Sequence, residues 1–413
     1  AVDTRQLLQN AIDYMDAHIK SQITPEDLSR VAGYSYVHLV RLFKLYLGVT
    51  PKAYLLRRRL LFAVYEMKSK RPKTDIAFDF GFDTYAGFYK AFQREFGCSP
   101  SAFTKAYIGS KPYRINILQE DYIMVSKAEI QKILSHWDLP NRTVKPIISE
   151  NTGRQNENAY YVADEYIIKY TTNLAAVQKA ILFDEVVKLH NTDAYLQLGE
   201  LYFMVTKRMH GAPLCCRTVF EDPTVAYTIG EKIADLHKKL SLYDPQDFPQ
   251  ANLYRDSMEN LEQVQKIAHL TDDFCTRYKK ECSQLYPQLP VQLIHRDLNP
   301  SNMIFDGKAF AGFIDFDLTE VNIRLFDLCY CATAILSECF GNAYHLERWK
   351  TILHNLIQGY HRVCALSEQE MAAVPYVIYS IQIICIAYFS AHDKYAELTK
   401  TNIQTLRWLL ANL

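Results

Sequence analysis

Four features are missing from this 413-residue sequence, and each absence narrows the class of protein. The chain has no net charge, because 46 Lys and Arg balance 46 Asp and Glu. This excludes a protein that is strongly basic or strongly acidic as a whole. The longest apolar stretch, residues 375–389, is shorter than the ~20 residues that cross a bilayer, so we expect a buried helix and no membrane partner. The ten cysteines form no CxxC pair and the first ten residues carry no apolar secretion signal, which predicts reduced thiols and a cytoplasmic location.

The neutral total conceals an uneven distribution of charge. Residues 1–110 hold 16 Lys and Arg against 10 Asp and Glu, a net charge of +6, and the remainder holds 30 against 36. A basic segment on a neutral chain indicates an appended nucleic-acid-binding module, although chance segregation would also give a difference of this size.

An internal repeat occupies the first hundred residues. Residues 28–35, LSRVAGYS, match residues 76–83, IAFDFGFD, and the similarity continues to Gly48 and Gly97. A repeat of this period indicates a duplicated supersecondary unit.

Each copy reads as two helices joined by a tight turn. Thr24 is a capping hydroxyl ahead of Pro25 at a helix start, and Gly33 and Gly81 supply the turns. The second helix of each copy has an apolar stripe that is expected to face inward. The inward residues are Leu39, Leu42, Phe43, Tyr46, Phe88, Phe92 and Phe96. The outward residues are Tyr36, Val37, Val40, Arg41, Lys44, Tyr85, Ala86, Tyr89 and Lys90.

A long helix over residues 51–73, with the basic run Arg57–Arg58–Arg59, is expected between the two copies. A rigid connection would let two helices enter successive major grooves on one face of DNA. A plain helical bundle with solvated outer faces is the alternative. The outward tyrosines and basic side chains at matching places favour DNA binding.

Residues 5–107, which carry these motifs, resemble the DNA-binding domain of AraC/XylS-type transcriptional regulators. The resemblance rests on Ile76-Ala77, Gly81-Phe82, Phe88, Phe92, Gly97 and Pro100. It implies base-edge contacts from two helices, and phosphate contacts or domain-interface packing for Arg57 to Arg59. The implied base-contacting residues are Tyr36, Val37, Val40 and Arg41 in the first helix and Tyr85, Ala86, Tyr89 and Lys90 in the second.

The rest of the chain carries residues suited to phosphoryl transfer. In LIHRDLNPSNMIF, residues 293–305, an apolar strand delivers His295 and Asp297 onto a loop, and Asn302 follows five residues after Asp297. A second apolar run delivers Asp315. Phosphoryl transfer needs a carboxylate that orients or deprotonates the attacking hydroxyl, and an amide and a second carboxylate that hold Mg²⁺.

Upstream residues fit the nucleotide side of the same reaction. Lys169 is the one cation in an apolar strand, and Glu185 is expected on a helix over residues 176–190, which is the kinase arrangement for the α/β-phosphates. The polar segment 150–158 is expected between strands, where a phosphate-covering loop belongs. It contains a single glycine, Gly153.

Residues from about 120 to 413 resemble the aminoglycoside phosphotransferase/choline kinase family, which has a protein-kinase-like fold. The resemblance rests on His295-x-Asp297-x₄-Asn302 and Ile314-Asp315-Phe316. It implies ATP or GTP and Mg²⁺ as cofactors. The implied roles are Asp297 as catalytic base, Asn302 and Asp315 as metal ligands, Lys169, Glu185 and Gly153 for the nucleotide phosphates, and the backbone near Thr206 and Arg208 for the base. His295 and Asp327 are expected to be structural, and Arg296 departs from a position that is often glycine.

The sequence therefore predicts a multidomain protein with an all-α double helix-turn-helix domain followed by an α+β, two-lobed kinase-like domain. The predicted limits are 1–108 for the DNA-binding domain, 109–119 for a linker, 120–206 for a β-rich small lobe and 207–413 for a mostly helical large lobe with catalytic loop 295–302 and metal segment 314–317.

We expect a transcriptional regulator that binds double-stranded DNA and whose kinase-like domain binds, and phosphorylates, a small alcohol or amine. A non-catalytic ligand sensor that controls DNA binding, a self-regulating antibiotic phosphotransferase and a scaffold for a partner protein are the alternatives. Homodimerisation is an expectation taken from the regulator family.

Acidic residues in the expected acceptor region, 317–393, mildly favour a cationic acceptor such as an aminoglycoside or choline. Homoserine, methylthioribose and other sugar alcohols fit equally well, and each acid taken alone is more often ordinary surface. These acids are Glu338, Glu347, Glu368, Glu370 and Asp393.

Overall fold

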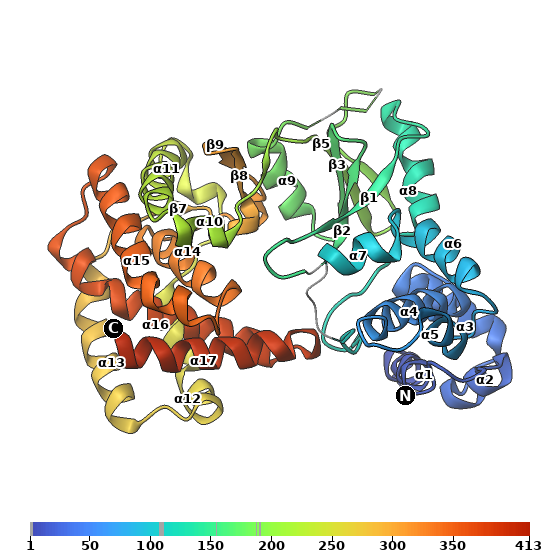
Figure 1. Ribbon diagram of the computed structural model, residues 1–413. Helices are drawn as coiled ribbons and strands as arrows, with labels where there is room; N and C mark the ends of the chain where they lie inside the picture. Colours follow the sequence, from blue (N-terminus) through green and yellow to red (C-terminus); the bar gives the residue numbers. More distant parts are fainter. Residues whose placement is uncertain (1–2, 107–110, 154, 187, 190) are drawn as a thin grey trace. The chain divides into compact units, whose positions relative to one another are not determined.

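The computed structural model describes every residue except 1–2, 107–110, 154, 187 and 190, and the chain divides into two compact units (Figure 1). The first unit comprises Ala1–Thr172, Val186–Arg208 and His392–Tyr395. The second comprises Asn173–Glu185, Met209–Ala391 and Ala396–Leu413. The N-terminal helices and the strands of the predicted small lobe thus belong to one unit. The predicted domain limits assign them to two separate domains.

Helices build the N-terminal region, as the repeat predicts (Figure 1), and five of them, α1 to α4 and α6, are capped by a side chain. The Thr24 hydroxyl accepts a hydrogen bond from the Asp27 N–H at 3.1 Å, and the Asp27 carboxylate accepts one from the Thr24 N–H at 3.0 Å, which makes a reciprocal capping box. Gly33 ends this helix in the left-handed conformation that glycine adopts without steric cost. The helices are α1 (Thr4–Ala17), α2 (Pro25–Ala32), α3 (Tyr36–Leu47), α4 (Pro51–Glu66), α5 (Lys73–Asp79), α6 (Tyr85–Phe96) and α7 (Pro100–Ala106).

The helix between the two copies is shorter than predicted. We expected it over residues 51–73, but α4 ends at Glu66 and α5 begins at Lys73, directly after Pro72. Proline disfavours helical conformation in the residue before it and has no N–H to donate, so a continuous helix through Pro72 would be broken.

Each copy has a hydrophobic core of its own. The first core is mainly aliphatic and includes Ile115, Ile117 and Met124 from the segment after the DNA-binding region. The predicted inward residues are buried, except that Tyr46 is only partly buried. The second core is rich in buried phenylalanines, which are Phe62, Phe80, Phe88, Phe92, Phe96 and Phe103.

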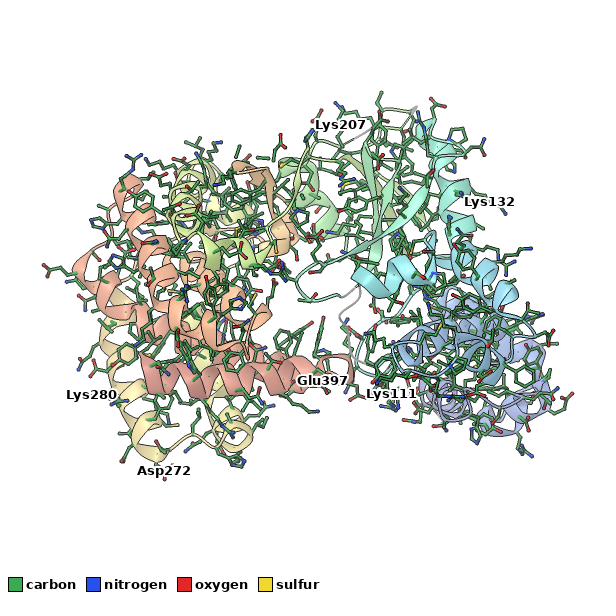
Figure 2. The ribbon with its side chains drawn as sticks, viewed as in Figure 1. Lys111, Lys132, Lys207, Asp272, Lys280 and Glu397 are labelled. Carbon is green, nitrogen blue, oxygen red and sulfur yellow. The ribbon has the colours of Figure 1, made fainter. Side chains whose placement is uncertain are left out.

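An antiparallel five-stranded sheet in the order β1-β2-β3-β5-β4 follows in the first unit. Helix α8 (Lys127–Ile133) packs its buried side chains on one face of this sheet, while Lys132 and the strand-end Lys207 are exposed at its periphery (Figure 2). Burial alternates along β3, so Lys169 lies on the face opposite the buried Ile168 and Tyr170. The strands are β1 (Val144–Ile148), β2 (Gln155–Val162), β3 (Tyr166–Thr171), β4 (Leu196–Leu198) and β5 (Leu201–Lys207).

The second unit is mostly helical, with short strand pairs that flank the catalytic loop. Strand β7 pairs with β10, and β6, β8 and β9 form a second small sheet. The strands are β6 (Ala212–Pro213), β7 (Val291–Ile294), β8 (Met303–Asp306), β9 (Ala309–Phe313) and β10 (Glu320–Ile323). The helices are α9 (Leu174–Phe183), α10 (Cys216–Glu221), α11 (Thr224–Leu240), α12 (Leu253–Ala268), α13 (Asp272–Leu285), α14 (Leu325–Glu338), α15 (Ala343–Val363), α16 (Glu368–Ser390) and α17 (Ala396–Asn412).

Two glycines let the backbones of α11 and α15 approach closely. A Cβ atom on Gly230 would lie 2.1 Å from the carbonyl oxygen of Leu356, and one on Gly359 would lie 2.0 Å from that of Tyr227. Any side chain at either position would therefore force the two helices apart.

Helix α16 contains the long apolar stretch of the sequence. It is long and apolar enough to cross a membrane by length and composition, but 61% of its most apolar window is buried inside the protein. Its side chains belong to the main core of the second unit, together with those of α12, α14 and α17. The buried helix predicted for residues 375–389 is confirmed.

Candidate catalytic loop and DNA-binding helices

The catalytic loop is fixed by one buried carboxylate. Asp327, on α14, accepts hydrogen bonds from the backbone N–H groups of His295 and Arg296, each at 2.8 Å. The buried His237 lies 3.0 Å from the same carboxylate through Nε2 and 2.7 Å from the Tyr360 hydroxyl through Nδ1. These bonds give Asp327 a structural role in holding the loop after β7.

Arg296 adopts a backbone conformation that explains why glycine suits this position. Its φ is +79°, in the left-handed region that side chains rarely adopt. The backbone N–H is held by Asp327, Nε donates to Glu320 at 3.2 Å, and the guanidinium lies 5.1 Å from the Phe326 ring centre. The surrounding contacts thus compensate for a strain on the order of 1–3 kcal/mol.

Asp297 is a partly buried carboxylate held by three donors. Its Oδ1 accepts hydrogen bonds from the Tyr330 hydroxyl at 2.9 Å and from Asn299 Nδ2 at 3.0 Å, and its Oδ2 accepts one from Asn302 Nδ2 at 3.0 Å. Burial, and then the nearby charge of Asp315, raise the pKa of Asp297, while the Tyr330 hydrogen bond opposes the shift. The carboxylate is therefore oriented in advance, in an environment that increases its basicity.

Asn302 and Asp315 offer oxygen atoms of the type that Mg²⁺ prefers. The Asn302 amide nitrogen donates to both the backbone oxygen and Oδ2 of Asp297, which leaves the amide oxygen as the atom suited to a cation. The Ile314 N–H donates to the Asn302 backbone oxygen at 3.0 Å and so ties the metal segment to the loop. Mg²⁺ is commonly held by one or two carboxylates and the phosphates of a substrate, so this donor set fits the ion.

The described part of the chain contains no group of three or more His, Cys, Asp and Glu residues that could hold a metal ion without other ligands. The carboxylates of Asp297 and Asp315 lie near enough for the charge of Asp315 to raise the pKa of Asp297. A cation between the phosphates and these side chains would relieve that repulsion.

Tyr330 is a site residue that the sequence reasoning missed. It follows Asp327 by three residues on α14, and so lies on the same side of the helix. Its ring stacks against Phe326, with ring centres 5.7 Å apart. A helix predicted from Leu325 onward, with Asp327 aimed at the loop, would have placed the Tyr330 hydroxyl toward Asp297.

The structure brings Asp297, Asn302 and Asp315 together in the second unit. Four of the predicted nucleotide residues belong to the first unit: Gly153, Lys169, Thr206 and Arg208.

Two of these residues, Lys169 and Thr206, lie in the sheet, and Arg208 directly follows β5. Lys169 pairs in register with Ala159 and Met204, and Thr206 pairs with Ile167. The guanidinium of Arg208 lies 4.2 Å from the ring centre of Tyr161.

Two expectations about the small lobe are wrong in their limits. Glu185 does not lie on a helix over residues 176–190, because α9 ends at Phe183 and Asp184 is extended. The chain then returns to the sheet through a bridge between Val186 and Thr206, which competes with further helix. The polar segment 150–158 is not all loop either, since β2 begins at Gln155.

The residues expected to contact DNA are accessible on α3 and α6, and none of them is buried. Val37 is 65% exposed, and Arg41, Ala86 and Lys90 are exposed as well. The half-buried members are Tyr36, Val40, Tyr85 and Tyr89.

The basic run of α4 is part of the protein interior. Arg58 is 3% exposed and makes a two-point ion pair with Asp16, with contacts of 2.7 and 3.0 Å. Arg57 is buried and contacts Glu95 at 3.1 Å, while Arg59 donates to backbone oxygens in the turn after α1. Of the two roles weighed for this run, packing fits Arg57 and Arg58, because a buried guanidinium cannot reach a phosphate.

Two acids of the expected acceptor region are engaged elsewhere. Glu370 is fully buried and forms a two-point ion pair with Arg324, at 2.7 and 2.8 Å. Asp393 belongs to the first unit, where it pairs with Arg114 at 2.5 Å. Neither residue supports a cationic acceptor.

Comparisons with known proteins identify two families along the chain. The helix-turn-helix domain family of AraC type matches residues 28–106, and the phosphotransferase enzyme family matches residues 171–372. The regulatory protein SoxS of Salmonella typhimurium is 34% identical over 100 residues, which are 24% of this chain and 94% of SoxS. The chain belongs to the AraC-type helix-turn-helix regulators through its N-terminal region and carries a phosphotransferase-family domain behind it.

Two further similarities concern the C-terminal region. The homoserine kinase of Zymomonas mobilis is 31% identical over 157 residues, which are 35% of this chain and 45% of that protein, so the chain spans less than half of this relative. The solved GDP and kanamycin complex of APH(2")-IIia has a TM-score of 0.50 and 15% identity, over 69% of this chain and 99% of that one. At this identity the likeness is one of fold alone.

Proposed function

We propose that this protein is a DNA-binding transcriptional regulator whose phosphotransferase domain uses ATP or GTP with Mg²⁺ to phosphorylate a small alcohol or amine. The observation that carries the enzymatic part is Asp297, a carboxylate oriented by Tyr330, Asn299 and Asn302 beside two oxygen ligands for a cation. Burial and the nearby Asp315 destabilise the charged form of Asp297 and so raise its pKa. A carboxylate held in such an unfavourable environment is typical of functional sites.

The residues in and near the loop have separate proposed roles in phosphoryl transfer. Asp297 takes the proton of the substrate hydroxyl as that oxygen bonds to the terminal phosphorus of the nucleotide, and the bond to the bridging oxygen breaks to release the nucleoside diphosphate. Asn302 and Asp315 would hold Mg²⁺, which would supply neutralisation of charge on the phosphates. Tyr330 keeps the Asp297 carboxylate aimed at the acceptor.

Residues outside the loop are proposed for the nucleotide. Lys169 and the loop ending at Gly153 are proposed to bind the nucleotide phosphates, with the backbone at Thr206 and Arg208 beside the base. Glu185, which stands just beyond α9, keeps its proposed place as the partner of Lys169.

Helices α3 and α6 are proposed to read DNA in the major groove, with the accessible residues described above. The basic balance of residues 1–110 supports binding to a polyanion. A cytoplasmic location is proposed as well, and a DNA partner and ten cysteines without disulfides support it. Self-association stays a prediction.

Homoserine is the first acceptor to test, because it carries both a hydroxyl and an amine and because a homoserine kinase is among the relatives. Kanamycin is the second, as a representative aminoglycoside. The measurement is mass spectrometry of the small molecules after incubation with ATP or GTP and Mg²⁺. We expect one acceptor to gain a phosphoryl group.

Asp297→Asn is the decisive variant, and Asp306→Asn is its matched control. Asp306 is an exposed carboxylate at the end of β8, outside the loop. We expect a loss of product on the order of 100-fold or more with Asp297→Asn and none with Asp306→Asn. Equal product from both variants would refute the role of Asp297.

One observation favours a second function, that of a ligand sensor. The DNA-binding helices and the small-lobe sheet belong to the same compact unit, so that occupancy of the sheet has a physical route to the DNA-binding helices. A sensor would bind nucleotide or acceptor without forming product. The same mass-spectrometric assay, combined with calorimetric titration of nucleotide, separates the two functions.

A further inference from the structure

Strand β1 touches the second helix-turn-helix copy at both of its ends. At its first residue, the Val144 carbonyl oxygen would lie 2.3 Å from a Cβ atom on Gly97, the residue that ends α6. At its last residue, Ile148 packs against the phenylalanine core of the second copy. A side chain at position 97 would therefore separate α6 from the strand.

The segment after the DNA-binding region connects the first copy to the same sheet. The Met124 N–H donates to the Leu47 carbonyl oxygen at 2.9 Å, and a Cβ atom on Gly48 would lie 2.4 Å from the Met124 oxygen. The Tyr113 hydroxyl donates to the Glu157 carboxylate on β2.

Arg57 and Arg58 reinforce this connection from α4. Arg58 donates to the Tyr113 backbone oxygen at 2.7 Å. Burial alone would lower the pKa of Arg57, but Tyr160 on β2, Tyr122 and Glu95 raise it on balance, so these groups lie around its guanidinium. The first copy thus contacts the connecting segment, which reaches the sheet through Tyr113 and Glu157, and the second copy contacts β1 directly.

The loop that follows β1 is the one to which the proposed function gives the nucleotide phosphates. It begins at Ser149, one residue after Ile148, and turns through a hydrogen bond from the Gly153 N–H to the Ser149 oxygen at 2.8 Å. The register of β1 against β2 shifts between Pro146 and Ile148, next to this loop. One short strand therefore lies between the loop and the end of α6.

We propose that β1 transmits nucleotide binding at the loop Ser149–Gly153 to the DNA-binding helix α6, through Gly97 and Ile148. This inference rests on the proposed function, which assigns the nucleotide to that loop. Binding changes DNA affinity only if the nucleotide prefers one of two arrangements of β1, and the effect must then be reciprocal. DNA binding accordingly changes nucleotide affinity by the same factor.

The test compares two glycine variants of the full chain. Gly97→Ala and Gly33→Ala both place a Cβ atom on a left-handed residue that ends a helix, with φ of +74° and +69°. A Cβ atom on Gly33 meets nothing within 4 Å, whereas one on Gly97 meets β1. The pair therefore separates loss of the β1 contact from backbone strain alone.

The probe is a duplex selected by the protein itself from a random DNA pool, and its Kd is measured with and without AMP-PNP and Mg²⁺. We expect these ligands to change the Kd of the wild-type protein about fivefold or more. The ratio falls toward one in Gly97→Ala and is kept in Gly33→Ala. Ile148→Ala, which leaves Gly97 intact, gives the same loss of coupling and covers the case in which Gly97→Ala does not fold.

The outcomes separate this inference from the proposed function. If nucleotide binds and DNA binds but the wild-type ratio is one, the coupling is refuted and the proposed function stands. If neither AMP-PNP nor its guanine counterpart GMP-PNP binds, the inference and the nucleotide part of the proposed function both fail. If Ile148→Ala and Gly97→Ala keep the wild-type ratio, β1 is not the transmitting element. If the ratio falls only in these two variants and DNA shifts the AMP-PNP affinity by the same factor, the inference is supported.

Discussion

The two helix-turn-helix copies reach one fold by different means. The first begins with a reciprocal capping box at Thr24, whereas α5 in the second begins after Pro72 without a side-chain cap. The first copy has a largely aliphatic core, and the second a core of phenylalanines. A duplicated sequence pattern thus specifies the turns and the inward stripe, and leaves both the capping and the packing free to diverge.

The copies also differ in what they hold. The first core is completed by Ile115, Ile117 and Met124 of the connecting segment, and the second by Ile148 of β1. The second copy therefore packs directly against β1 of the sheet, whereas the first copy packs against the segment that precedes the sheet. Substitutions in the two copies should differ in their effects on stability and on coupling.

The largest expected effect is loss of a core ring in the second copy. Phe92→Ala should lower the free energy of unfolding by about 4 kcal/mol, because Phe92 is fully buried and its ring contacts those of Phe96 and Phe103. Leu39→Ala, the matched change in the first copy, should cost about 3 kcal/mol. Hydrogen exchange of the full chain, followed by mass spectrometry, assigns each loss to its copy. Equal deprotection of both copies by either variant would show one shared core.

Next comes the pair of helix-ending glycines. Gly33→Ala should cost about 1 kcal/mol, the price of a side chain in the left-handed region. Gly97→Ala should cost about 3 kcal/mol, since the displaced contact with Val144 adds to that strain. Calorimetric unfolding of the two variants measures the difference. Equal costs would mean that α6 moves away from β1 without resistance.

The capping difference predicts a smaller effect. Thr24→Ala should destabilise α2 by about 1 kcal/mol, because the Asp27 N–H loses its acceptor. Pro72→Ala, at the corresponding place before α5, removes no side-chain cap and should change the free energy of unfolding less than Thr24→Ala does. Exchange rates of the first-turn amides in each helix report the effect. A larger loss with Pro72→Ala would contradict the comparison.

The smallest effect concerns DNA. Arg41→Ala and Lys90→Ala remove one exposed cation from each of the helices α3 and α6, which are proposed to read DNA. If both meet phosphates, each should reduce the slope of log Kd against log salt concentration by about 1 and weaken binding to all sequences alike. If one instead contacts a base, its removal should relax specificity at one position of the selected site. Titration at several salt concentrations distinguishes the two.

Much of the fold follows from local patterns. The glycine turns, the Thr24 cap and the apolar stripes each depend on a few neighbouring residues, so they could be predicted without the structure. The order of His295, Asp297 and Asn302 in LIHRDLNPSN likewise predicts the catalytic loop. The fold class of both regions is confirmed by the family matches.

What escaped prediction depends on contacts between distant segments. Gly97 is explained in the sequence by its helix end, and nothing local reveals the close approach of Val144. For Arg57 and Arg58 the sequence left phosphate contacts and interface packing open, because their partners Glu95 and Asp16 lie about forty residues away along the chain. The end of α9 before Glu185 depends on the bridge from Val186 to β5. Tyr330 required knowing which side of α14 faces the loop.

The loop His392–Tyr395 has a consequence for genetics. Its neighbours in sequence, α16 and α17, belong to the second unit, yet Asp393 pairs with Arg114, which also holds Asp13 of α1 at 2.7 Å. The DNA-binding region therefore cannot be removed intact by one cut, since part of its unit is encoded between α16 and α17. A screen for suppressors of defects at Asp13 should look almost four hundred codons downstream.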